Sequence, residues 1–151
     1  MQDVETLFLK YRDDVYRLAL SYTRSPSEAE DVCQTVFLKL MEQRSIAPGK
    51  ERAWLMQVTA NTCRNLVRSH WWQRTTGLEE TVTVEPPQVN EVLQAVLALP
   101  PKYRVVVYLY YFEYSTTSEI AKLLKISPTA VTTRLNRARK MLKEQIREVA
   151  L

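Results

Sequence analysis

The sequence is short of glycine, since Gly49 and Gly77 are the only two in 151 residues. Runs of β-branched residues are also few, whereas Leu, Ala, Glu, Arg and Gln are abundant. These are the residues that favour helices, so the composition predicts an all-α protein. The two glycines are then expected at joints between helices.

Long apolar runs are missing, although 46% of the residues are hydrophobic. No segment approaches the ~18 apolar residues that cross a bilayer. The first residues, MQDVETLF, are acidic and amphipathic and do not resemble a secretory signal. A cytoplasmic protein with a core of ordinary size is therefore expected.

Metal-binding residue types are scarce. Cys33 and Cys63 lie far apart with no CxxC pair, and both fall on apolar helical positions. Reduced core cysteines are the favoured interpretation, with a disulfide or a metal role as the alternative. His70 is the only histidine and has no cluster to join. We therefore expect no metal and no other cofactor.

Charge is unevenly distributed, although the formal net charge is only +4. It amounts to −2 over residues 1–44, +4 over 45–74, −4 over 75–101 and +6 over 102–151. Two basic blocks separated by an acidic one suggest two surfaces that meet a polyanion. A solvated charged face is the ordinary alternative for either block.

The first half predicts a three-helix unit. Apolar residues recur every three or four positions over 3–23 and again from 27 to about 43. Ser27 and Glu30 fit a capping box, so the second helix is expected to begin at Ser27. A third helix is expected from about 52 to 72. Its predicted core-facing residues are Trp54, Leu55, Val58, Thr62, Leu66 and Val67.

The second half predicts a linker and four helices. Residues 75–90 lack a helical period, and their prolines and acids indicate an extended linker. A helix with Val92, Val96 and Leu99 inward should stop at Leu99, because a residue before proline avoids the helical region. Further helices are expected over 101–113, over 115–125 and from 128 to about 148.

The last two predicted helices are joined by only two or three residues, with Ser127 as an N-cap. This is the arrangement of a helix-turn-helix, whose second helix can enter a DNA major groove. Hydroxyls and amides read base edges, while Arg and Lys meet phosphates. The alternative is a surface helix that is merely basic. The candidate residues are Ser127, Thr129, Ala130, Thr132, Thr133 and Asn136, flanked by Arg134, Arg137, Arg139 and Lys140.

Three motifs occur in order: "AEDVCQTVFLKL" (29–40), "RAWLMQVTANTCRNLVR" (52–68) and "EIAKLLKISPTAVTTRLNRARKML" (119–142). Together they resemble a bacterial RNA polymerase sigma factor, specifically the small extracytoplasmic-function (ECF) group of the sigma-70 family. The resemblance covers nearly the whole chain. It implies sigma region 2 over residues 1–74, a linker over 75–90 and sigma region 4 over 91–151.

In the family, the helix matching 27–43 docks on the β′ subunit of the polymerase. Leu38 lies off the predicted buried stripe, so it should be an exposed apolar residue that a partner would cover. Thr35 stands where the family often has an acid, which weakens one implied contact. The matching positions are Asp31, Gln34, Thr35, Leu38 and Met41.

The loop 45–53 and the following helix match the family's reader of the −10 promoter element, where a base is flipped into a pocket. Trp54 is expected in the core. Trp71 and Trp72 could stack on bases or cover the end of the bundle. Asn61 and Arg64 are hypothesised to act in strand opening. The matching positions are Lys50, Arg52, Asn61, Arg64, Asn65 and Arg68.

The final unit matches the reader of the −35 element. The resemblance implies that Thr132, Thr133 and Asn136 face bases, while Arg134 and Arg137 anchor the DNA backbone. Ser127 and Thr129 complete the set at the start of the helix. The family frequently has a long cation where Thr132 stands, so the resemblance implies the placement of the helix but not the −35 sequence.

The implied function is an alternative sigma factor that performs no covalent chemistry. Its implied partners are core RNA polymerase (β and β′ subunits), promoter DNA and an anti-sigma factor, which in this family is often membrane-bound. The acidic linker would thread through the polymerase. No small-molecule substrate is expected. The alternative is a stand-alone helix-turn-helix repressor or activator. A nuclease with a carboxylate metal site is a third and weaker option.

Overall fold

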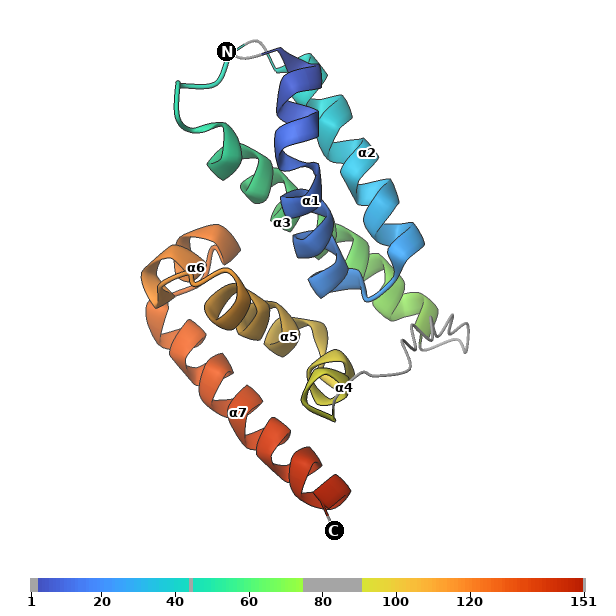
Figure 1. Cartoon of the computed structure of the whole chain (residues 1–151), viewed down its shortest axis with the longest axis vertical. Coiled ribbons are helices and arrows are strands. Elements are labelled where there is room, and N and C mark those ends of the chain that lie inside the picture. Colours follow the sequence, from blue (N-terminus) through green and yellow to red (C-terminus); the bar gives the residue numbers. More distant parts are fainter. Residues whose placement is uncertain (1–2, 44, 75–90, 151) are drawn as a thin grey trace. The chain divides into compact units, whose positions relative to one another are not determined.

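The computed structural model describes residues 3–43, 45–74 and 91–150 (Figure 1). All regular elements in these ranges are helical, and their contacts divide the chain into unit 1 (Met1–Val82) and unit 2 (Thr83–Leu151). The expected all-α fold with two helical domains is thereby confirmed. The predicted linker, 75–90, lies outside the described residues.

Unit 1 consists of α1 (Val4–Thr23), α2 (Pro26–Glu42) and α3 (Glu51–Arg74), and each of these helices packs on the other two (Figure 1). Leu7 and Leu18 of α1, Leu40 of α2 and Leu55 of α3 are fully buried between them. Burial of each such side chain stabilises the fold by about 1.5–3 kcal/mol before entropy is counted. Unit 1 thus has an apolar core of its own.

The start of α2 differs from the prediction. The N-cap is Ser25, whose Oγ accepts a hydrogen bond from the backbone N–H of Glu28 at 3.3 Å. Pro26 occupies the first helical position, where its fixed φ suits a helix and its missing N–H costs nothing. The helix therefore begins two residues earlier than the Ser27 cap would require, and Ser27 lies within its first turn.

The core-facing stripe of α3 also differs from the prediction. The buried residues on this helix are Leu55, Met56, Thr59, Ala60 and Cys63. Trp54, Val58, Thr62 and Leu66 are only half-buried, and the side chain of Val67 lies outside the described residues. Thr59 can be buried because its hydroxyl donates to the carbonyl of Leu55 at 2.6 Å, within its own helix. A polar residue thus occupies the centre of the buried stripe.

Both cysteines are buried free thiols, which confirms their assignment to the core. Burial raises the pKa of Cys33 to about 11 and that of Cys63 to about 12. Thiols with such values remain protonated at neutral pH and are poor nucleophiles.

Unit 2 consists of α4 (Glu91–Ala98), α5 (Pro101–Val107), α6 (Thr117–Leu124) and α7 (Pro128–Ala150). Val96 and Leu99 pack with Tyr103 and Ala138 in its core. Val92, predicted to face inward, is 52% exposed. The chain leaves α4 at Leu99 and re-enters a helix at Pro101, as the two prolines predict.

The corner between α4 and α5 is held by a buried arginine. Arg104 is only 5% exposed, and its guanidinium donates to the carbonyl of Leu99 at 2.8 Å and to that of Leu97 at 3.4 Å. The Leu97 carbonyl belongs to the last turn of α4 and that of Leu99 directly follows the helix, so neither has an intrahelical donor left. Arg104 adds to the basic charge of residues 102–151, but its buried guanidinium has a structural role and is not part of a charged surface.

The predicted helix 101–113 changes character after Val107. Tyr108–Phe112 form a π-helical segment, η1, in which the backbone N–H of Glu113 donates to the carbonyl of Tyr108 at 3.2 Å. Tyr114 follows with a φ of 54°. Segments of this kind are rare and often lie at functional sites. Here η1 faces α6.

The helix-turn-helix is formed by α6 and α7. Thr116 and Glu119 make a reciprocal capping box at the start of α6. The Ser127 hydroxyl accepts the backbone N–H of Ala130 at 3.0 Å, which confirms the predicted cap of α7. Ile120 and Val131 are fully buried between the two helices. The polar face of α7 is thereby turned outward.

Candidate nucleic-acid and partner interfaces

The predicted docking residues lie along one side of α2. Asp31 and Gln34 are exposed and Thr35 is half-buried. Leu38 and Met41 are exposed over 59% and 64% of their surfaces. These positions are three or four residues apart, so they share one helix face opposite the buried stripe. We call these five residues the α2 face.

The predicted −10 residues begin in the loop before α3. Lys50 and Arg52 are exposed. The Nε of Arg52 donates to Oδ2 of Asp14 on α1 at 3.1 Å, and Asp14 also pairs with Arg17 at 2.6 Å. This link could not be predicted from the sequence, because the partners are separated by 38 residues.

Further along α3, the structure brings Asn61 and Arg64 together. The Asn61 side-chain oxygen accepts hydrogen bonds from Arg64 and from Gln57, the latter at 3.2 Å. Asn65 is exposed on the next position. The side chain of Arg68 lies outside the described residues, as do those of His70, Trp71 and Trp72. The oxygen of Asn61 is thus engaged within the helix, which leaves its amide N–H₂ as the group to offer a ligand.

The start of α7 presents a polar surface. Ser127, Thr129 and Thr132 are exposed, while Thr133 is half-buried. Ser127 is occupied as the N-cap. The Thr132 hydroxyl donates to the carbonyl of Pro128 at 3.1 Å. With its proton committed to the backbone, Thr132 offers an oxygen acceptor and a methyl group to a ligand.

The cations of α7 lie beside this surface. Arg137 is exposed and Arg134 half-buried. Burial alone would raise the pKa of Tyr103, but its hydrogen bond to Arg137 and the charges of Arg137 and Lys102 outweigh that effect and lower the pKa. The Arg137 guanidinium is therefore near the Tyr103 hydroxyl.

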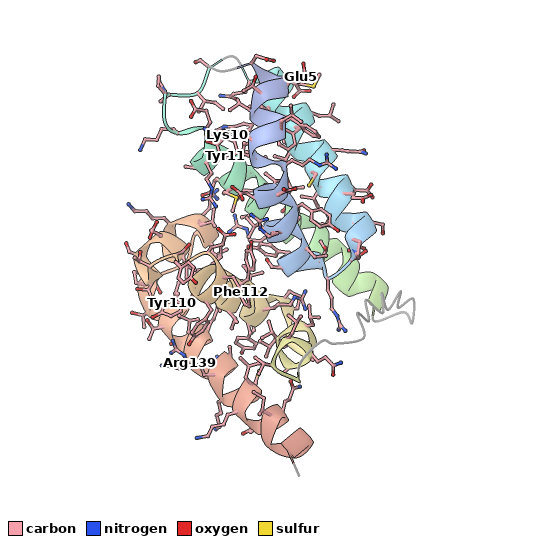
Figure 2. The ribbon with its side chains drawn as sticks, in the orientation of Figure 1. Glu5, Lys10, Tyr11, Tyr110, Phe112 and Arg139 are labelled. Atoms are coloured by element: carbon pink, nitrogen blue, oxygen red, sulfur yellow. The ribbon has the colours of Figure 1, made fainter. Side chains whose placement is uncertain are left out.

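Arg139 is held by aromatic residues that the sequence did not single out. Its Nε donates to the Tyr111 hydroxyl at 2.7 Å, and its guanidinium lies 5.6 Å from the ring centroid of Tyr110 and 5.7 Å from that of Tyr111. Figure 2 shows Tyr110 of η1 close to Arg139 of α7. The Nη1 of Arg139 donates to Oδ1 of Asn136 at 3.1 Å. The sequence shows a run of tyrosines before a basic helix, but it does not indicate which cation these tyrosines contact.

Comparison with known proteins identifies both units. The model of Sigma-70 region 2 matches residues 7–73, and that of Sigma-70, region 4 matches residues 90–142. The ECF RNA polymerase sigma factor SigM of Bacillus subtilis (strain 168) is 30% identical over 151 residues, which cover 93% of each chain. The chain belongs to the ECF group of the sigma-70 family.

Other relatives of this sigma factor differ in length. The ECF RNA polymerase sigma factor SigE of Mycolicibacterium smegmatis is 29% identical, with coverage of 97% of this chain and 62% of that one. A Xanthomonas campestris protein named as the probable RNA polymerase sigma factor RfaY is 30% identical, but the chain spans only 38% of its length.

Two solved structures share the fold of this sigma factor. RpoE from Bartonella quintana, in complex with the anti-sigma factor NepR, gives a TM-score of 0.77 at 18% identity, covering 97% and 98% of the two chains. CnrH, in complex with the cytosolic domain of CnrY, gives 0.66 at 21% identity, covering 96% and 88%.

Within the described ranges, no helix is both long and apolar enough to span a membrane. The same part of this sigma factor contains no group of three or more His, Cys, Asp or Glu side chains placed to hold a metal.

Proposed function

We propose that this sigma factor binds core RNA polymerase, directs it to a −10 and a −35 promoter element, and initiates transcription without covalent chemistry of its own. Residues 1–74 act as region 2, residues 91–151 act as region 4, and 75–90 link them. The observation that carries the proposal is the pairing, in one chain, of the exposed α2 face with the polar and basic face of α7.

The α2 face is the proposed docking surface for the β′ subunit of the polymerase. Leu38 and Met41 expose apolar surface to water, which a partner would remove. Asp31 and Gln34 lie beside them and would supply polar contacts at the rim. Because all five residues share one helix side, a single partner helix could cover them together.

The −10 element is assigned to the loop before α3 and to the polar face of α3. Lys50 and Arg52 would attract the phosphates of the non-template strand. Asn61, Arg64, Asn65 and Arg68 follow at helical spacing, so they share a side of α3. A donor from Asn61 and a cation from Arg64 could stabilise an unstacked base and its phosphate, offsetting the few kcal/mol that unstacking costs.

The −35 element is assigned to the start of α7. Thr132, Thr133 and Asn136 would face base edges in the major groove, and Arg134 and Arg137 would hold the DNA backbone. Ser127 and Thr129 lie at the N-terminus of the helix, where backbone N–H groups favour a phosphate.

We further infer that an anti-sigma protein binds this sigma factor in the cytoplasm, with retention at the inner face of the membrane where that protein is membrane-bound. Two structural neighbours share the fold, RpoE in complex with the anti-sigma factor NepR and CnrH in complex with the cytosolic domain of CnrY. The exposed apolar residues of the α2 face would be a suitable surface for competition with the polymerase.

The experiment is retention of purified core polymerase by the immobilised 151-residue chain, followed by run-off transcription from a promoter library. We expect the double change Leu38→Gln and Met41→Gln to weaken retention about tenfold or more, the effect of losing central apolar contacts. Leu9→Gln is the matched control, because Leu9 is 69% exposed but lies on α1.

Equal losses in the control and the double variant would refute the α2 assignment. DNA binding by the chain with no retention of polymerase would instead support a stand-alone helix-turn-helix regulator, for which the exposed α2 face would have no use.

A further inference from the structure

The bonds around Arg139 constrain a residue assigned to base recognition. Asn136 is exposed on the outer side of α7 and is three residues from Arg139. The side chains of residues at this spacing meet on a helix surface. Arg139 is in turn tied to Tyr111 of η1, so a chain of contacts runs from η1 to Asn136.

The chemistry of the two side chains determines which atom of Asn136 bonds to Arg139. A guanidinium has N–H donors and no acceptor, so any hydrogen bond between Arg139 and Asn136 must use the amide oxygen of Asn136. The amide oxygen of Asn136 therefore faces Arg139, and its nitrogen cannot take that place. The amide N–H₂ is then turned to the solvent side, where a base would lie.

Arg139 is itself held in place. The Tyr111 hydroxyl accepts from its Nε at 2.7 Å, while the rings of Tyr110 and Tyr111, in an edge arrangement with centroids 4.9 Å apart, both lie within 6 Å of its guanidinium. A planar cation confined by two rings and a hydroxyl loses little further freedom when it holds Asn136. Figure 2 shows one of these two residues, Tyr110, near Arg139.

We propose that Tyr111 and Arg139 are positioning residues that make Asn136 a hydrogen-bond donor in −35 recognition, so that it selects keto bases over amino bases. In the major groove guanine presents two acceptors, N7 and O6, and thymine presents one, O4, whereas cytosine presents the amino donor N4 and adenine pairs its single acceptor N7 with the amino donor N6. The familiar paired contact of asparagine with adenine needs the amide oxygen as acceptor, and one of its two lone pairs already accepts from the positively charged Arg139.

This inference rests on the proposed function, since it requires α7 to lie in the major groove of a −35 element. It goes beyond that proposal by stating what one side chain reads, and by giving Tyr111 a recognition role that acts through Arg139 and Asn136.

The test uses holoenzyme reconstituted from core polymerase and the 151-residue chain. It is bound to promoters with randomised −35 bases, and the bound and free fractions are sequenced. We expect the wild type to prefer guanine and thymine over adenine and cytosine about tenfold at one position. Asn136→Ala should abolish the preference at that position only and so identify it.

Tyr111→Phe removes one hydroxyl and keeps both rings. We expect it to lower the keto-over-amino ratio at the Asn136 position to about twofold, since Arg139 loses its anchor, with preferences elsewhere unchanged. Tyr110→Phe is the matched control and should leave the ratio at the wild-type value. Arg139→Lys keeps the charge but loses the planar fork, and it should reproduce the loss of ratio.

Several results would overturn the proposal. One is an adenine preference at the Asn136 position. Another is an unchanged ratio in both Tyr111→Phe and Arg139→Lys while Asn136→Ala loses it. A uniform loss of affinity for every −35 sequence would assign Tyr111 a purely structural role. If wild-type holoenzyme showed no −35 dependence at all, the proposed function would fail as well.

Discussion

Two arginines assigned near DNA are held in opposite ways. Arg52, in unit 1, donates to the carboxylate of Asp14, whereas Arg139, in unit 2, lies against two tyrosine rings and a hydroxyl. The first arrangement neutralises the cation and the second leaves its charge intact. An arginine paired with an acid must give up that partner to meet a phosphate, while one held by tyrosines can be oriented and charged at the same time.

Arg104 is a third case, in which the arginine is buried and its guanidinium donates to backbone carbonyls. We expect Arg104→Met to destabilise unit 2 by about 2–3 kcal/mol, since carbonyls at the end of α4 lose a charged donor. Urea unfolding would measure the loss. Lys102→Met, at an exposed cation two positions away, should cost far less, and an equal cost would show that only charge matters.

Arg137, which is near Tyr103, tests whether a cation close to a tyrosine serves as a phosphate contact. Arg137→Ala should weaken binding of holoenzyme to all promoters by a similar factor, and it should lower the slope of log affinity against log salt by about 1. Binding titrations at several salt concentrations check this. Arg137→Lys should retain the slope. A change in the preferred −35 bases would instead make Arg137 a base reader.

Asp14 neutralises Arg52, so its replacement tests the effect of that ion pair on DNA binding. Asp14→Asn removes the acceptor charge beside Arg52, so binding to a −10 forked promoter should tighten about two- to fivefold, given that exposed ion pairs are worth at most about 1 kcal/mol. Fluorescence anisotropy with labelled DNA measures the change. Asp13→Asn removes the same charge from the neighbouring exposed residue. An equal gain from both would assign the effect to net charge alone.

Lys125 gives the smallest expected effect, because it is constrained through its backbone. It ends α6 with a φ of 58°, a left-handed conformation that costs a side chain more than it costs glycine. Lys125→Gly should stabilise unit 2 by about 0.5 kcal/mol after the greater freedom of glycine in the unfolded chain is subtracted. Thermal unfolding would show it, and a lower melting temperature would contradict it.

The sequence predicted the helices and the helix-turn-helix well, because apolar spacing, prolines and caps are local signals. The Ser127 cap and the stop at Leu99 follow from residues only a few positions away. The start of α2 was placed wrongly because two serines lie near it, and only the position of Pro26 selects Ser25. The stripe of α3 was misplaced because Thr59 satisfies its hydroxyl within the helix, which periodicity does not reveal.

The candidate surfaces were predictable as sets of residues but not as arrangements. Spacing alone puts Leu38 and Met41 on one exposed helix side. It cannot show that Arg52 meets Asp14, or that Arg104 turns inward to a corner, because both depend on how separate helices pack. The contact of Arg139 with Tyr111 likewise joins residues that are 28 positions apart.

The π-helical segment η1 has a consequence for insertions and deletions. A π turn holds one more residue than an α turn, and a single residue rotates everything after it by about 100°. Removing one residue from 108–112 would let the segment form an ordinary α-helix. Its aromatic side chains would then point in a different direction around the helix axis. The length of this short stretch, as much as its composition, therefore sets which tyrosine lies against α7.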